Sequence, residues 1–227
     1  MKGRLTTTSA WRRTSNVPPS YESVNFLLRP AKHIERRMIC DFLRRLAVFA
    51  PLEQYSYVGF GANSFGDFSL YHRLLGITNM VSIESEEEDK ERFELNKPYG
   101  AITMSYGFSS AVLRDSLGSQ KLAILWLDFD KHLDSSKLGD IRLFVASARS
   151  GSVLLTTVCA EPQYPDNRLE ELVSRVGSEA VPPELGEIDL QGWGYGRAER
   201  RIINNAIQGV LLDRDGPLLE DDKFDYH

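Results

Sequence analysis

The chain has 227 residues, of which 42% are apolar and 26% charged, close to the averages of globular domains. This composition excludes a disordered chain, and the longest apolar stretches, around Leu122–Leu127 and Val153–Cys159, are too short to span a membrane. The net charge of −5 argues against a general nucleic-acid binder.

That net charge is unevenly distributed, because residues 1–45 carry +7 and the remainder of the chain carries −12. The first acidic residue is Glu22, and Arg12 and Arg13 stand in a Thr/Ser-rich stretch, which indicates a flexible tail, an arm on the domain or an organelle transit peptide. We predict a basic N-terminal arm and helix over residues 1–50. Its charge suits contact with a phosphate or an acidic partner.

The helical pattern of this first region begins at Ala31, and Pro30 just before it suits a helix start. Apolar residues recur in it at steps of three and four and therefore share one arc: Ile34, Met38, Ile39, Phe42, Leu43 and Leu46. Arg36, Arg37 and Arg44 fall on the opposite arc, which we interpret as a solvated face rather than a phosphate-binding stripe.

From residue 51 onward, short β-forming runs alternate with helical patterns. The predicted strands are Tyr55–Gly59, Met80–Glu84, Ala101–Tyr106, Leu122–Asp128 and Ser152–Cys159. The predicted helices between them are Phe68–Leu75, Glu86–Asn96, Ser110–Leu117 and Ser136–Ala148. This alternation predicts an α/β fold of the doubly wound, Rossmann-like class, with a mostly parallel sheet and helices on both faces, over residues 51–227. The fourth and fifth strands are so apolar that we expect both faces of each to be buried at the sheet centre.

The region after Cys159 is less regular. It contains two helical patterns, Asn167–Val176 and Ala198–Gly209, and one weak β-like stretch, Val210–Asp213. The glycine–aromatic segment Gly192–Gly196 is predicted to be a loop, either a plain surface loop or a mobile lid over a flat substrate.

Ligands of such sheets bind beyond the carboxyl ends of the strands, where this chain places glycines and then an acid. Gly59 and Gly61, separated by Phe60, follow the first strand, and a helix comes next, as in a ligand-binding turn or an ordinary tight turn. Glu84 ends the second strand at the distance from these glycines expected of a carboxylate that binds a ribose. The alternative is that Glu84 only begins an acidic helix N-terminus.

The ends of the third and fourth strands add further candidates. Phe108 and Ser109 follow the third strand, where an aromatic ring and a hydroxyl suit a base, although Ser109 also suits a helix cap. Asp128 and Asp130 leave the fourth strand two residues apart, and Asp130 or His132 could act as a general base. The alternative readings are a turn cap for Asp130 and a surface position for His132.

The two cysteines, Cys40 and Cys159, form no disulfide framework, and neither they nor the histidines show metal-ligand spacing. We therefore predict buried free thiols, a reducing and cytoplasmic location, and no metal site.

Taken in order, the segments YVGFG, MVSIE, GFSS and ILWLDFD resemble class I S-adenosylmethionine-dependent methyltransferases over about Tyr55–Cys159. With the lead-in Arg29–Arg36, the chain is similar to bacterial O-methyltransferases of unassigned substrate. The resemblance implies S-adenosylmethionine as cofactor, with Gly59, Phe60 and Gly61 at the methionine moiety. It further implies Glu84 on the ribose, Phe108 and Ser109 beside the adenine, and Asp128 at the sulfonium.

Three departures from that family pattern leave alternatives open. Tyr57 stands where an acid often precedes the first glycine, no third close glycine follows, and the usual C-terminal strand hairpin is not evident. A catalytically silent fold that serves as an interaction module is one alternative. An NAD-dependent oxidoreductase is the other, although the turn does not complete G-x-G-x-x-G. The methyl acceptor, a small molecule or a protein, and the oligomeric state are not defined by the sequence.

Overall fold

The computed structural model describes residues 30–61, 64–84, 89–116, 121–162, 164 and 166–215. Most of the predicted basic arm and the acidic C-terminal segment therefore lie outside the described residues. The strands are β1 (Ser56–Gly59), β2 (Asn79–Glu84), β3 (Ile102–Tyr106), β4 (Ala123–Asp128) and β5 (Val153–Thr157). The α-helices are α2 (Pro30–Leu43), α3 (Gly66–Leu75), α4 (Lys90–Asn96), α5 (Ser109–Ser116), α6 (Ser135–Ser147), α7 (Arg168–Val176) and α8 (Gly194–Asp215).

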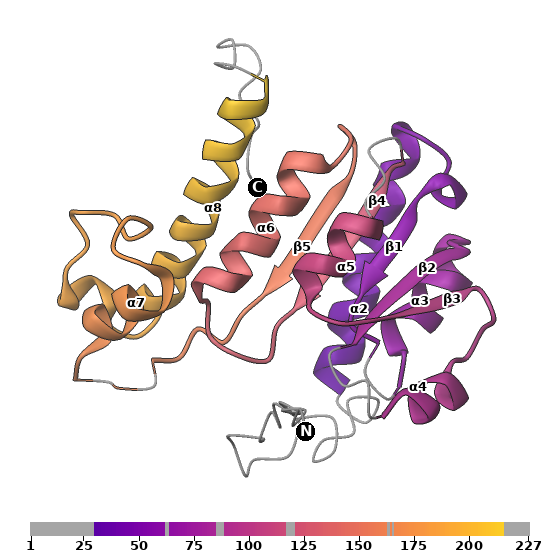
Figure 1. Cartoon of the computed structure of the whole chain (residues 1–227), viewed down its shortest axis with the longest axis horizontal. Coiled ribbons are helices and arrows are strands. Elements are labelled where there is room, and N and C mark those ends of the chain that lie inside the picture. Colours follow the sequence, from indigo (N-terminus) through magenta and orange to yellow (C-terminus); the bar gives the residue numbers. More distant parts are fainter. Residues whose placement is uncertain are drawn as a thin grey trace, which may run out of the picture.

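Within the described residues, five strands form one parallel sheet in the order β3-β2-β1-β4-β5, which confirms the doubly wound α/β class (Figure 1). The chain moves outward from β1 through β2 to β3, then returns to the other side of β1 for β4 and β5. The strand order therefore reverses between β1 and β4, where sheets of this class bind their ligands. Because the strands are parallel and in register, with Glu84 opposite Tyr106 and Asp128 opposite Thr157, their carboxyl ends meet at one edge.

Each face of the sheet has its own hydrophobic core. Strand β4 shows the two-residue period, because Leu125 and Leu127 belong to one core and Ile124 and Trp126 to the other. Helices α5, α6, α7 and α8 cover the first face, and α2 and α3 cover the second. The alternating burial within β4 explains why its unbroken apolar run forms a strand buried on both sides.

Strand β5 is a correction to the prediction that it shares the centre of the sheet. Among the described residues it pairs only with β4, and all five of its residues are half-buried. Leu154 packs against one hydrophobic core and Val153 and Leu155 pack against the other, yet the outer edge of β5 has no neighbouring strand in the described part of the chain. Local hydrophobicity does not distinguish a strand at the centre of the sheet from one at its edge, since strand order depends on the whole chain.

The C-terminal region also differs from its prediction. Val210–Asp213 is helical and belongs to α8, which begins at Gly194, and Tyr195 in the first turn is buried. Of the predicted loop Gly192–Gly196, only Gly192 and Trp193 therefore precede the helix. The physical reason is packing, because the buried Ala198, Ile202 and Ala206 lie on one helical face of α8 that Val210 extends against the same core. No strand follows β5 in the described residues, so the expected hairpin is replaced there by helices.

Helix α2 is rotated relative to its predicted orientation. Ile34, Met38 and Phe42 are each more than half exposed, whereas Arg36 is half-buried and Cys40 fully buried. The face with Arg36 and Cys40 therefore packs on the domain. Cys40 and the half-buried Cys159 are both free thiols. Of the helices described, none is long and apolar enough to cross a membrane.

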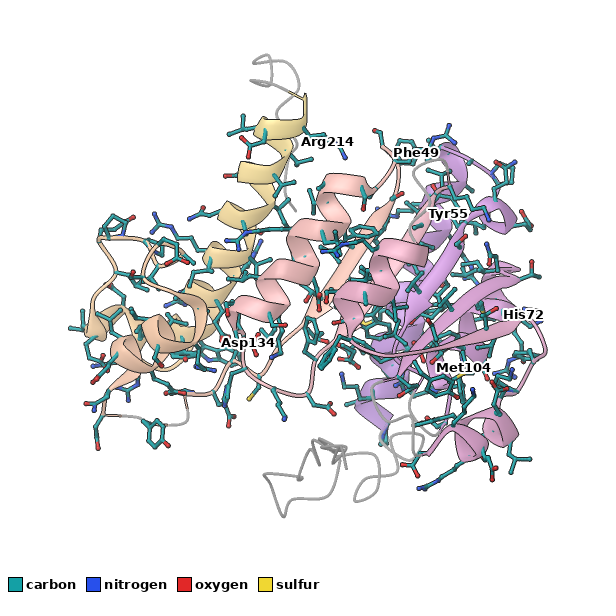
Figure 2. The ribbon with its side chains drawn as sticks, in the orientation of Figure 1. Phe49, Tyr55, His72, Met104, Asp134 and Arg214 are labelled. Carbon is teal, nitrogen blue, oxygen red and sulfur yellow. The ribbon has the colours of Figure 1, made fainter. Side chains whose placement is uncertain are left out.

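Helix α6 is held at both ends by side chains. The Asp134 carboxylate accepts a hydrogen bond of 2.9 Å from the Lys137 N–H at its start, and the Arg214 Nη1 of α8 donates to the Val145 and Ala148 carbonyls at its end. Figure 2 shows the labelled Asp134 and Arg214 near opposite ends of the helix. Both caps satisfy backbone groups that a helix leaves unpaired.

Gly139 in the interior of α6 offers a test of this helix. A Cβ atom added there would have no neighbour within 4 Å, so Gly139→Ala is expected to stabilise the protein by about 0.5–1 kcal/mol through reduced backbone entropy of the unfolded chain. Urea unfolding would measure the change. Gly61→Ala is the contrasting control, because its Cβ would lie 2.5 Å from the Phe65 ring and should destabilise the fold. A loss of stability in Gly139→Ala would contradict the prediction.

Candidate functional site

A cavity of about 330 Å³ lies at the carboxyl edge of the sheet, beside the point where the strand order reverses. Its lining comes from the ends of β2 and β4, from the segments that follow β1, β3 and β4, and from the first turns of α5 and α6: Phe60, Ile83, Glu84, Gly107, Phe108, Ser109, Asp128, Phe129, Asp130, Lys131 and Lys137. Six of the eight residues predicted for the site are among them. The other two, Gly59 and Gly61, lie in the turn beside Phe60.

The glycine turn after β1 needs glycine because of what packs beneath it. A Cβ on Gly59 would lie 2.5 Å from the Tyr57 hydroxyl, and one on Gly61 would lie 2.5 Å from both the Phe65 ring and the Ser82 Oγ. The sequence suggested that these glycines admit a ligand. In the structure, protein side chains occupy the space beside these glycines, and the absence of a Cβ lets the turn pack closely on β2.

Glu84 is joined to this turn through a serine that the sequence interpretation overlooked. The Gly61 N–H donates to the Ser82 Oγ at 2.9 Å, and the Ser82 hydroxyl donates to the Glu84 Oε1 at 3.2 Å. Glu84 is only 8% exposed, at the end of β2 and in the wall of the cavity. Ser82 and Glu84 are two residues apart on one strand and so share a face, which is the signal that could have identified Ser82.

The segment after β3 supplies an aromatic rim. Gly107 has φ +136°, a conformation that favours glycine, and the next residue, Phe108, is 82% exposed in the cavity lining. The Ser109 hydroxyl donates to the Asp140 carboxylate of α6. Ser109 thus lines the cavity while its side chain joins α5 to α6.

Asp128 is held from two directions. The Thr157 hydroxyl of β5 donates to its Oδ1, and the Lys32 Nζ of α2 lies 3.7 Å from the same oxygen and 3.1 Å from the Glu35 carboxylate. Lys32 is a second residue that the sequence interpretation missed. It lies in the Arg29–Arg36 lead-in, where the sequence pattern assigns no residue a role.

The remaining candidates differ in position. Asp130 is exposed in the cavity lining, together with Lys131, and Lys137 places its amine 5.5 Å from the centre of the Phe129 ring. His132 is not part of the lining, and its Nδ1 lies 3.1 Å from the Cys159 carbonyl oxygen. The geometry therefore places Asp130 closer to the cavity than His132. Within the described ranges, no three His, Cys, Asp or Glu side chains are grouped as a metal site would require.

Chemically, the cavity offers a buried carboxylate at one end, an exposed aromatic ring beside it and two further carboxylates with amines at the other end. A carboxylate at a strand end accepts hydrogen bonds from vicinal hydroxyls, and an exposed ring stacks on a planar base. The lining is thus suited to a nucleoside, with reactive groups at Asp128 and Asp130. These roles remain predictions.

Comparison with known proteins gives one result. A family model described as "Putative O-methyltransferase" matches residues 24–227, which is most of the chain. No curated protein and no solved structure matches it.

Proposed function

Because the chain belongs to the O-methyltransferase family whose model spans residues 24–227, and is therefore a methyltransferase, we propose S-adenosylmethionine as donor and an oxygen atom as acceptor. The observation that carries the choice of donor is the position of Glu84. This buried carboxylate lines the cavity at the end of β2 and is tied through Ser82 to the glycine turn of β1. That arrangement matches the ribose end of a nucleoside cofactor.

The side chains around Glu84 fit the remainder of this cofactor. Phe108 offers an exposed ring for the adenine, and Phe60 and the turn at Gly59–Gly61 lie next to the end of β4, where the methionine moiety belongs. When bound, S-adenosylmethionine supplies a methyl group on a positively charged sulfur. Residues of the chain therefore have to bind and orient two reactants and exclude water, which is the main requirement for an in-line displacement.

Asp128 and Asp130 receive the acceptor in this proposal. Asp128, oriented by Thr157 and Lys32, positions the acceptor, and Asp130, exposed in the cavity wall, takes the proton of an acceptor hydroxyl as the oxygen attacks. The acceptor is a small molecule or a protein side chain. A base is unnecessary if the acceptor oxygen is already ionised at the working pH.

Ligand-induced thermal stabilisation tests the donor against both alternatives. S-adenosylmethionine at about 100 times its Kd should stabilise the folded chain by about 2.7 kcal/mol, whereas NAD should have no effect. Stabilisation by NAD alone would identify an oxidoreductase and overturn the proposal. No response to either ligand, checked by calorimetry, would indicate a silent interaction module.

A further inference from the structure

The cluster beneath the glycine turn contains a buried carboxylate that the proposed function does not use. Asp67, in the first turn of α3, is 6% exposed and accepts a hydrogen bond from the hydroxyl of the fully buried Tyr57 in β1. The Tyr57 side chain runs toward the carboxyl end of its strand, because a Cβ on Gly59 would lie 2.5 Å from its hydroxyl. The Asp67–Tyr57 pair therefore packs directly against the glycine turn at Gly59.

This pair is costly for the fold. Burial raises the pKa of Asp67 to about 6, against the opposing effects of the Tyr57 hydrogen bond and the Arg36 charge. Burial also raises the pKa of Tyr57 well above its ordinary value. Buried polar pairs of this kind add little to stability compared with well-packed apolar residues, so their presence next to a ligand site indicates a role in that site.

Other buried polar groups surround Asp67 and Tyr57, and two of them make no hydrogen bond to described residues. Charged and titratable groups of three helices and strands lie around Asp67 and Tyr57: Arg36 and Cys40 of α2, Tyr71 of α3 and Asp128 of β4. Two buried donor groups here, the Arg36 Nε and the Tyr71 hydroxyl, have no hydrogen-bond partner among the described residues. Asp67 thus belongs to a cluster of polar side chains from α2, α3 and β1 that lies near Asp128, which lines the cavity.

We propose that Asp67 and Tyr57 are positioning residues for the cofactor, with the carboxylate of α3 acting through the tyrosine hydroxyl to hold the turn at Gly59–Gly61. The proposal rests on the proposed function. It explains why this chain has Tyr57 at the position where related sequences often have an acid before the first glycine. Here Asp67 of the following helix supplies the negative charge instead. It assigns Arg36 the role of favouring the charged form of Asp67.

Calorimetric binding of S-adenosylmethionine to the full chain tests this assignment. Tyr57→Phe and Asp67→Asn should each weaken binding by about 10-fold, since the first removes the hydrogen bond to the carboxylate and the second removes the negative charge of its acceptor. Tyr55→Phe serves as the matched control and should bind as the wild type does, because it removes a tyrosine hydrogen bond of 3.2 Å to the Gly151 carbonyl and leaves the Asp67–Tyr57 pair intact.

The pH profile separates positioning from a merely structural role. Wild-type affinity should fall as the pH drops through about 6, where Asp67 takes up a proton, and the Asp67→Asn variant should lack that component. If the wild type and Glu84→Ala differ in affinity while Tyr57→Phe and Asp67→Asn bind like the wild type, the positioning role is wrong and the proposed donor stands. If the folded wild type does not bind S-adenosylmethionine at all, both proposals are wrong.

Discussion

Replacing Glu84 by alanine is expected to lower the affinity for S-adenosylmethionine by about 100-fold, or about 3 kcal/mol, because hydrogen bonds to a charged acceptor contribute about 1.5–3 kcal/mol each. Glu84 is nearly buried in the cavity wall, so its carboxylate would hold the ribose hydroxyls with little competition from water. Isothermal titration calorimetry measures the loss directly.

Two further variants make the Glu84 prediction specific. Glu84→Gln keeps the shape of the side chain and one acceptor oxygen. Its affinity for S-adenosylmethionine should fall by about 10-fold, because only part of the hydrogen bonding is lost. Glu91→Ala removes an exposed acid of the neighbouring α4 and should leave the affinity unchanged. Urea unfolding of each variant establishes that it is folded. Wild-type affinity in a folded Glu84→Ala protein would show that the ribose site is misplaced.

The folded state is expected to lose about 3 kcal/mol of stability between about pH 4.5 and 7 because of Glu199. This residue of α8 is 1% exposed, and neither carboxylate oxygen has a hydrogen-bond partner among the described residues. Burial raises its pKa from 4.5 to about 7, although the Arg175 charge opposes the shift. The folded protein thus keeps the proton that the unfolded chain releases, so stability falls as the pH rises through this range and then levels.

Glu199→Gln isolates this contribution. Comparing urea unfolding of the variant and the wild type at about pH 5 and about pH 8 should show a relative gain for the variant at the higher pH, because its buried group does not ionise. Glu184→Gln is the control, since Glu184 is an exposed acid paired with Arg201 on the surface. If the stability difference between Glu199→Gln and the wild type were the same at both pH values, the buried-charge assignment would be wrong.

Much of the architecture was predictable because it depends on local patterns. The runs that became β1 to β5 are short and rich in β-forming residues, and each predicted strand overlaps the observed one. Gly76 ends α3 in the left-handed conformation, as its place after the helical pattern predicts. Since parallel strands share an edge, the same patterns also placed Glu84, Phe108 and Asp128 around one cavity.

Other parts of the site depended on contacts between distant segments. Lys32 reaches Asp128 from a helix almost a hundred residues earlier, and Asp67 meets Tyr57 only because α3 packs on β1. No periodicity within a single segment encodes such a contact. The same reason explains α8, where a β-branched residue, Val210, continues a helix because its neighbours pack on α6.

The sequence by itself therefore determined the class of the sheet, the positions of its strand ends and the residues placed there, since these follow from local hydrophobic patterns. Only the tertiary structure decided the strand order that leaves β5 at the edge and the face that α2 presents to the domain. It also revealed the contacts of Ser82, Lys32 and Asp67 with residues of the candidate site. Those features depend on which surfaces bury each other in three dimensions, and that choice is made by the whole chain at once.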